Sequence, residues 1–285
     1  MPLRRRRAVA APAADFGRTD GPVSPLAVDK MWNYGRRLLQ PQYWPELRRF
    51  VMRRLSGKPL DENTAPEAHA VTADMAISHA EAFEALGLPN SGLRSFASEE
   101  HARWAAAEMR VNAARGGMGG GADIDLLYSL CCAFNAVRVL ETGVAFGWSS
   151  LAILSAVGSR PGAMLTSVDL PYLGANLDDL VGLAVPNDLK ERWSLRRGAD
   201  RDELPQAIAD TRPIDLAHYD SDKSYAGRRW AYPLIWEGLR DGGLLMSDDV
   251  EDNLAFLDFA ADISVKPLIV SAPYRNRLAG ILRKA

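Results

Sequence analysis

Residues 139–150 have the sequence VLETGVAFGWSS, a pattern typical of a buried strand that turns into a helix. Gly143 permits a turn that side chains resist and lets a ligand approach the backbone closely, and Gly147 lets the following helix pack tightly. Ser149 and Ser150 offer hydroxyls and free amide groups at the start of that helix, which is a favourable seat for a carboxylate. The stretch therefore predicts a ligand site at a strand-to-helix turn.

Strand-like and helix-like segments alternate on both sides of this turn. Helices are expected at 123–134, 149–157 and 230–239, and strands at 137–142, 164–169, 214–219 and 243–247, with 189–195 leading into another. Several strands are continuous apolar runs, which predicts a parallel sheet covered on both faces. The last two strands, 265–271 and 278–282, are joined by a turn at 273–276 and predict a closing antiparallel pair. The expected fold class is α/β: a Rossmann-like doubly wound sheet, mostly parallel with a C-terminal antiparallel strand, plus an N-terminal helical region.

Three segments are expected along the chain: a disordered basic arm at 1–26, a helical N-terminal or cap region at 27–121, and the main domain at 122–285. Within the cap, helical periodicity covers 28–55, 68–86 and 98–114, and Ser98 is a candidate N-cap of the last helix. The glycine-rich run 116–121 is not preceded by a strand or followed by Lys-Ser/Thr, so it favours a hinge over a phosphate loop.

Composition narrows the classes of function. The chain has 285 residues, 47% of them hydrophobic, which is enough for a sizeable core, and its formal charge of −2 gives no overall attraction to nucleic acid or anionic membrane. No apolar run approaches the roughly 20 residues of a transmembrane helix, so no membrane span is expected. Cys131 and Cys132 are adjacent in an apolar helical run, as small buried residues of a reducing compartment would be. The cytoplasm is the expected location.

Two acidic residues extend the predicted ligand site. Asp169 ends the strand after the glycine turn, 26 positions beyond Gly143, where an acid can bind the two hydroxyls of a ribose. Asp200 closes a Gly-Ala-Asp turn after the third strand and is placed to border an adenine. The third glycine of the dinucleotide fingerprint G-x-G-x-x-G is absent, which makes a pyrophosphate ligand such as NAD less favourable.

Residues 141–150 resemble motif I of class I S-adenosylmethionine-dependent methyltransferases, E-x-G-x-x-x-G followed by hydroxyl residues. Residues 214–225 (IDLAHYDSDKSY) and 242–250 (GGLLMSDDV) resemble the metal-dependent O-methyltransferases of the macrocin and mycinamicin type, and more distantly catechol O-methyltransferase. The resemblance runs from about residue 123 to the C-terminus and does not cover 1–60. It implies S-adenosyl-L-methionine as methyl donor, with these residues at the cofactor: Glu141, Gly143, Gly147, Ser149, Asp169 and Asp200.

The same resemblance implies that Asp220, Asp248 and Asp249 hold Mg²⁺ or Mn²⁺ and that Lys223 is the general base. Macrocin-like members usually carry histidine at the position of Lys223 and catechol-type enzymes carry lysine, so this chain departs from its nearer relatives there. Three carboxylates from two strand ends suit a hard cation, although acidic residues at loop tips are also commonly just solvated. Asp222 is expected to cap the next helix or orient Lys223 rather than bind the metal.

The expected function is O-methylation of a small hydroxylated acceptor, such as a sugar or natural product. Acceptor contacts are expected from 60–121, 171–186 and 252–259, with four aromatic residues that are candidates for either a pocket wall or the core: Trp148, Tyr172, Trp230 and Phe256. One alternative is an NAD-type oxidoreductase or oxygenase-like enzyme on the same sheet. Another is a non-catalytic or RNA-directed methyltransferase-fold protein, which only the arginine-rich arm supports. A nucleic-acid partner is not expected, and a homo-oligomer is left open.

Overall fold

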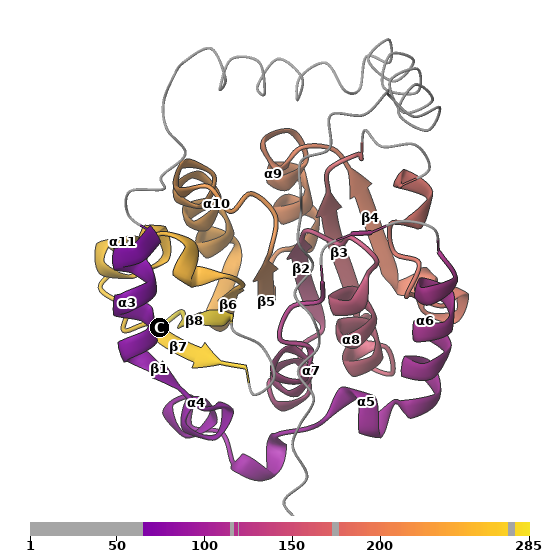
Figure 1. Ribbon diagram of the computed structural model, residues 1–285, viewed down its shortest axis with the longest axis horizontal. Coiled ribbons are helices and arrows are strands. Elements are labelled where there is room, and N and C mark those ends of the chain that lie inside the picture. The colour runs from indigo at the N-terminus through magenta and orange to yellow at the C-terminus, as the bar shows by residue number, and fades with distance from the viewer. Residues whose placement is uncertain (1–64, 115–116, 119, 173–176, 273–276) are drawn as a thin grey trace, which may run out of the picture.

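The computed structural model describes residues 65–114, 117–118, 120–172, 177–272 and 277–285. The predicted basic arm, the helical pattern at 28–55 and the turn at 273–276 lie outside the described residues, as does part of the glycine-rich run at 116–121. The described chain forms one sheet with helices on both of its faces (Figure 1). None of its helices has the length and apolar character that crossing a bilayer requires.

The sheet has eight strands in the order β1-β7-β8-β6-β5-β2-β3-β4. Their bounds are β1 Ala76–Ile77, β2 Arg138–Thr142, β3 Met164–Asp169, β4 Trp193–Arg197, β5 Ile214–Tyr219, β6 Leu239–Ser247, β7 Leu268–Ser271 and β8 Leu278–Arg283. Only β8 is antiparallel, to β6 and β7. The predicted Rossmann-like, mostly parallel sheet with an antiparallel C-terminal strand is confirmed. From β2 the chain adds β3 and β4 on one side and then returns to add β5 and β6 on the other. The topological switch point therefore lies between β2 and β5, where such folds bind ligands.

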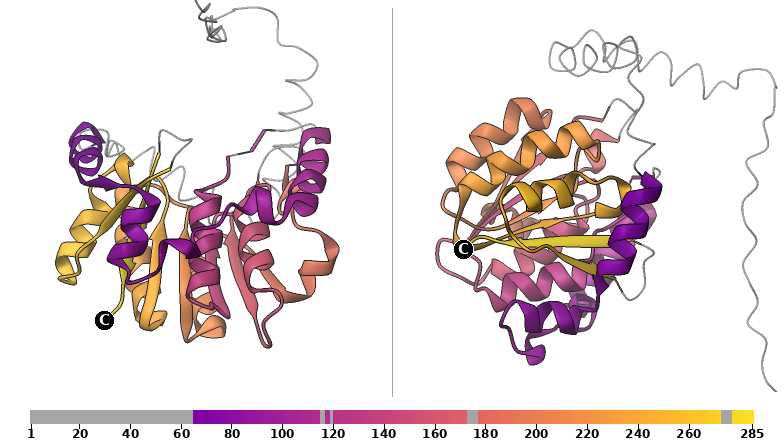
Figure 2. Two further views of the ribbon diagram at one scale, coloured as in Figure 1. Left: turned by 90° about the horizontal axis from the view of Figure 1, so that it is seen from below. Right: turned by 90° about the vertical axis from the view of Figure 1, so that its left-hand side faces the viewer.

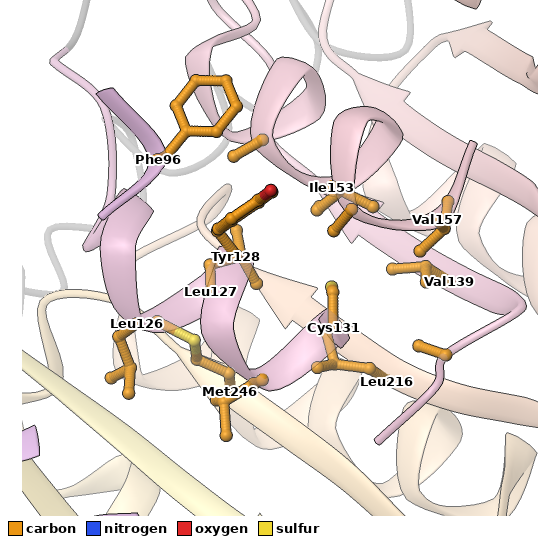
Figure 3. Close-up of a cluster of buried hydrophobic side chains, with 14 of the residues drawn as sticks. Phe96, Leu126, Leu127, Tyr128, Cys131, Val139, Ile153, Val157, Leu216 and Met246 are labelled. Carbon is orange, nitrogen blue, oxygen red and sulfur yellow. The ribbon is translucent and has the colours of Figure 1, made fainter. Parts of the chain in front are cut away.

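Two buried clusters cover the two faces of this sheet, because neighbouring strand residues point in opposite directions. Val139 belongs to the cluster beneath α7 (Ile124–Ala133) and α8 (Trp148–Val157), and Leu140 to the one beneath α9 (Asp200–Thr211), α10 (Tyr225–Gly238) and α11 (Ala255–Asp262). Figure 3 shows the first cluster, in which Cys131 is packed among apolar side chains. Both cysteines are free; Cys131 is buried as predicted, whereas Cys132 is only partly buried.

The predicted helix at 68–86 is instead two helices, α3 (Ala65–Met75) and α4 (His79–Ala85), separated by β1. Ser78 caps α4 in a capping box with Glu81: the Ser78 backbone N–H donates to Glu81 Oε2 at 2.8 Å, and the Glu81 N–H donates to Ser78 Oγ at 3.3 Å. The two-residue strand pairs in parallel with β7 at the edge of the sheet. Sheet pairing and a local cap thus interrupt a continuous helical pattern.

The predicted helix at 98–114 is also divided, into α5 (Phe96–Glu99) and α6 (His101–Ala113). Ser98 lies inside α5 and caps nothing, so that prediction was wrong. The start is set instead by a tertiary contact: Phe96 is fully buried, and its backbone N–H donates to Asp125 Oδ1 at 2.8 Å. The remaining helical turns are short: η2 Asn90–Gly92, η3 Asp178–Leu180, η4 Asn187–Arg192 and η5 Val250–Asp252. Figure 2 shows the N-terminal elements beside the sheet.

Candidate functional site

A cavity of about 620 Å³ opens where the parallel strands end, over the switch point between β2 and β5. The loops after β2, β3, β4, β5 and β6 all contribute to its wall. Of the site residues predicted from the sequence, the cavity is lined by Gly143, Ser149, Asp169, Asp200, Asp220, Lys223, Asp248 and Asp249. Glu141 and Gly147 do not line it. The fold thus brings together residues as far apart in the sequence as Gly143 and Asp249.

Gly143 is required by the backbone around it. Its φ is +80°, and a Cβ at this position would lie 2.2 Å from the carbonyl oxygen of Asp220. A side chain at this position would therefore collide with the backbone that follows β5, whether or not a ligand is bound. The glycine lets the turn after β2 pass closely over the end of β5, which places Asp220 at the edge of the cavity.

Gly143→Ala should lower the free energy of unfolding by about 2–4 kcal/mol, because it adds a left-handed backbone penalty to a steric clash. Urea unfolding followed by circular dichroism measures the loss. Gly162→Ala is the matched control, since Gly162 also has a positive φ (+72°) but nothing lies within 4 Å of its added Cβ. Equal losses in the two variants would show that contact with Asp220 contributes nothing.

Glu141 lies behind the cavity wall. Its carboxylate is fully buried, and Oε2 accepts hydrogen bonds from Ser150 Oγ at 2.6 Å and Ser167 Oγ at 2.7 Å. His218 Nδ1, equally buried on β5, lies 3.9 Å from the other carboxylate oxygen. These contacts tie β2 to α8 and β3 directly beneath the glycine turn. Gly147, with φ +85°, precedes α8, and its added Cβ would lie 2.9 Å from Gly182 Cα, so it accommodates a neighbouring loop.

Asp169 is held at the end of β3 by two partners. Its Oδ1 accepts a hydrogen bond from the Val144 backbone N–H at 3.1 Å, and Oδ2 pairs with Arg197 at the end of β4. Arg197 also pairs with Asp178, whose Oδ1 accepts from the Tyr172 N–H at 3.0 Å. Burial raises the pKa of Asp169 above its ordinary value despite these donors. No sequence pattern had predicted Arg197 as a site residue, because it is a single residue at the end of another strand, β4.

Asp200 begins α9 and faces the same cavity. The Ser221 hydroxyl donates to Asp200 Oδ2 at 2.5 Å and lies 2.9 Å from the Thr142 hydroxyl, so the ends of β2 and β5 are connected to the start of α9. Burial raises the pKa of Asp200 to about 6. The carboxylate is thus anchored on one side and presented to the cavity on the other.

Three other carboxylates of the cavity lining gather in one cluster. One oxygen from each of Asp220, Asp248 and Asp249 lies within 4.8 Å of the others. Asp220 follows β5 and the other two follow β6, which pairs with β5 in parallel. Asp249 has a φ of +52°, in the left-handed region that a non-glycine residue rarely adopts. The clustering predicted from the sequence is therefore present in the structure.

Two cations face this acidic cluster. Lys223 Nζ lies 2.9 Å from Asp220 Oδ1 and also pairs with Asp249. Arg277 Nε lies 3.1 Å from Asp249 Oδ1, and its Nη1 contacts Asp252 at 2.9 Å. Burial opposes the charged form of Lys223, but the Asp220 and Asp249 carboxylates outweigh it, so the pKa of Lys223 is raised above its ordinary value. Arg277 directly follows residues 273–276, which lie outside the described chain. The sequence analysis did not predict Arg277 as a site residue.

Asp222 and two of the four aromatic candidates line the cavity, and the other two aromatic residues do not. Ser224, not Asp222, is the N-cap of α10, and Asp222 Oδ1 instead accepts from the Ser224 N–H at 3.1 Å. Trp148 and Tyr172 line the cavity. The Arg201 guanidinium lies over the Trp230 ring, with the Arg201 Cζ atom 4.7 Å from the ring centroid. Phe256 is fully buried in the core.

Residues 140–250, which include most of the residues that line this cavity, match a family model described as a methyltransferase domain. This part of the chain is therefore similar to methyltransferase domains. Together with the doubly wound sheet and the cavity at its switch point, this match confirms the class I S-adenosylmethionine-dependent methyltransferase predicted from the sequence. It also favours a methyltransferase over an NAD-type oxidoreductase on the same sheet.

Two solved structures illustrate the likeness of this methyltransferase to others. An O-methyltransferase from Bacillus cereus in complex with SAH is 16% identical, with a TM-score of 0.47, over 75% of this chain and 100% of that one. The O-methyltransferase TomG from Streptomyces achromogenes, involved in tomaymycin synthesis and solved with SAM, is 16% identical, with a TM-score of 0.49, over 65% of this chain and 89% of that one. No curated protein sequence matches the chain. The domain match, and not these distant likenesses, carries the assignment.

Proposed function

We propose that this methyltransferase transfers the methyl group of S-adenosylmethionine to a hydroxyl oxygen of a small acceptor, assisted by a divalent cation. The observation that carries the proposal is that two chemically different groups of residues line one cavity. Asp169 and Asp200 form what we call the donor end, and Lys223 with the cluster of Asp220, Asp248 and Asp249 forms what we call the acidic end. Because both ends open into the same space, a donor and an acceptor bound there are within reach of each other.

The donor end suits a nucleoside that carries an amino-acid tail. Asp169, fixed by Val144 and Arg197, is placed to accept hydrogen bonds from ribose hydroxyls. Asp200 is placed to accept one from the adenine amino group. Ser149 lies in the first turn of α8, where unpaired backbone amides and the helix dipole favour a carboxylate. Glu141 and Gly147 support this end from behind.

The acidic end suits a hard divalent cation such as Mg²⁺ or Mn²⁺. Oxygen ligands from Asp220, Asp248 and Asp249 are what such cations prefer. Within the described chain, Asp220 Oδ1 and Asp249 Oδ1 are buried atoms that accept no hydrogen bond, although cationic side chains lie at ion-pair distance. When bound, the cation would favour ionisation of an acceptor hydroxyl by stabilising its negative charge.

In this proposal Lys223 receives the acceptor's proton. The acceptor oxygen attacks the methyl carbon in line with the C–S bond; an O–C bond forms, the C–S bond breaks, and the sulfonium becomes a neutral thioether. Holding the two groups in line supplies much of the rate enhancement, since the sulfonium is already a good leaving group. A bound cation would neutralise the charges of Asp220 and Asp249. It would thereby weaken the ion pairs that otherwise keep Lys223 protonated.

We also propose the class of acceptor, the cellular location and the domain boundaries. The acceptor is a sugar or natural product of small size, and the enzyme acts in the cytoplasm. The proposed domains are a cap at 27–121, of which the structure describes residues from 65 onward, a methyltransferase domain at 122–285, and a basic arm at 1–26 that lies outside the described residues. From the cap, the cavity receives Gly120 and Gly121, next to Trp148, which supports a role of the cap in acceptor binding.

Thermal unfolding tests the donor. At about a hundred times its dissociation constant, S-adenosylmethionine should stabilise the folded chain by about 2.7 kcal/mol, and NAD should leave the melting temperature unchanged. Asp169→Asn should reduce the shift produced by S-adenosylmethionine, whereas Asp179→Asn, outside the cavity lining, should not. A shift with NAD and none with S-adenosylmethionine would overturn the proposed donor.

A further inference from the structure

Arg228 is a charged side chain with no access to solvent. It lies one turn into α10, five positions after Lys223, and its relative exposure is 0%. Its Nη2 donates to the backbone carbonyl oxygens of Asp248 at 3.1 Å and Asp249 at 2.8 Å. Its Nε and Nη1 are buried and make no hydrogen bond within the described chain. Within the described chain, the guanidinium therefore donates its hydrogen bonds to the backbone carbonyl oxygens of Asp248 and Asp249.

Core packing alone does not account for this residue. Burying a guanidinium costs several kcal/mol after relaxation, and an apolar side chain of similar volume would avoid that cost. Hydrogen bonds from a charged donor to carbonyl oxygens recover part of it and are stronger than neutral ones. The only such bonds that Arg228 makes in the described residues fall on Asp248 and Asp249, where the site places its carboxylates.

The turn at Asp248 and Asp249 depends on contacts with other parts of the chain to keep its conformation. Asp249 adopts a left-handed conformation (φ +52°), and such a residue persists only where surrounding contacts fix it. A second contact runs in the opposite direction: Asn253 Nδ2, beyond the same turn, donates to the Lys223 carbonyl oxygen at 2.8 Å. Arg228 and Asn253 thus link the loop that carries Lys223 to the turn that carries Asp248 and Asp249.

We propose that Arg228 is a positioning residue that fixes the Asp248–Asp249 turn in the geometry that binds a divalent cation. The inference rests on the proposed cation site and adds how this chain builds it. Arg228 acts through backbone carbonyl oxygens and touches neither donor nor acceptor. Without it, the turn relaxes from the left-handed conformation of Asp249 and the carboxylates diverge. Cation affinity then falls, while the donor end of the cavity is unaffected.

The test compares Arg228→Met and Arg228→Lys with Arg229→Met. Arg229 is the next residue on α10, is partly exposed and pairs with Asp262, so its variant controls for the loss of an arginine from this helix. Mn²⁺ affinity is measured by electron paramagnetic resonance without donor or acceptor, and S-adenosylmethionine affinity by calorimetry. We expect Arg228→Met to weaken Mn²⁺ binding by about 10–100-fold, the range for losing a residue that orients metal ligands. Donor affinity should stay within about twofold, and Arg229→Met should behave as wild type.

Arg228→Lys keeps the charge but reaches fewer carbonyl oxygens, so it should give an intermediate Mn²⁺ affinity. Wild-type Mn²⁺ affinity in Arg228→Met, or in Arg228→Lys should the methionine variant not fold, would overturn the positioning role. Equal losses of Mn²⁺ and donor affinity would also overturn it, since they indicate a general packing defect. If wild type itself binds no Mn²⁺, the proposed cation role fails instead. Hydrogen exchange at residues 248–253 in the metal-free variants then tests the positioning role, with unchanged protection as the contrary result.

Discussion

Lys223→Ala is expected to lower kcat by about 10²–10⁴-fold, the usual range for loss of a general base. The ammonium lies 2.9 Å from Asp220 and also pairs with Asp249, two of the carboxylates proposed to hold the cation. Affinity for S-adenosylmethionine should change little, because Asp169 and Asp200 at the donor end have no contact with this side chain. Single-turnover kinetics with saturating donor, together with calorimetry, separates the two quantities.

Two further substitutions at this position separate a base from a counter-ion. Lys223→His should retain part of the activity, since imidazole can accept a proton at the same place. Lys223→Arg should not rescue, because a guanidinium stays protonated in proteins. A base must lose its proton, and the carboxylates raise the pKa of Lys223, so the wild-type rate should climb as pH increases. The histidine variant should reach its plateau at lower pH. An active arginine variant with the wild-type pH profile would make Lys223 only a counter-ion.

The buried strands were predictable because burial on both faces requires a continuous apolar run. The bounds of β3 and β5 agree with the sequence prediction to the residue. The region before residue 115 was predicted less well, because its helical periodicity continues through Ser78 and Glu100, whereas the helices of the structure are interrupted at those residues. Pairing of β1 with β7 and the contact between Phe96 and Asp125 join residues far apart in sequence, and a local pattern carries no information about either.

The same reasoning explains which parts of the site were visible in the sequence. Strand ends in a parallel sheet meet at one edge, so Asp169, Asp220 and Asp248 could be placed together from their position after apolar runs. The arginines that hold them were not visible. Arg197, Arg228 and Arg277 come from the far end of a strand, the interior of a helix and a loop end, and each acts through an ion pair or a carbonyl contact that has no spacing rule.

Removal of the proposed divalent cation is the other change with a large expected effect. Excess chelator should reduce turnover by at least about a hundredfold, and Mg²⁺ or Mn²⁺ should restore it. Asp249→Ala should reproduce the chelated state, because it deletes one of the three clustered carboxylates and a partner of both Lys223 and Arg277. Asp252→Ala is the matched control: Asp252 also pairs with Arg277 but lies outside the cavity lining. It should leave turnover within a few-fold of wild type.

The contrast between these two variants identifies what the acidic cluster does. Asp249 meets Lys223 and Arg277 at once, so an alternative is that the cluster serves only to hold these two cations in place. In that case Asp249→Ala would impair the enzyme equally with and without added Mn²⁺, and the wild type would turn over undiminished in excess chelator. If the carboxylates bind a cation, wild type responds to chelator, Asp249→Ala does not, and raising the Mn²⁺ concentration partly rescues the variant through Asp220 and Asp248. The interaction between chelator and mutation, more than the size of either effect, therefore decides whether this methyltransferase works through a metal.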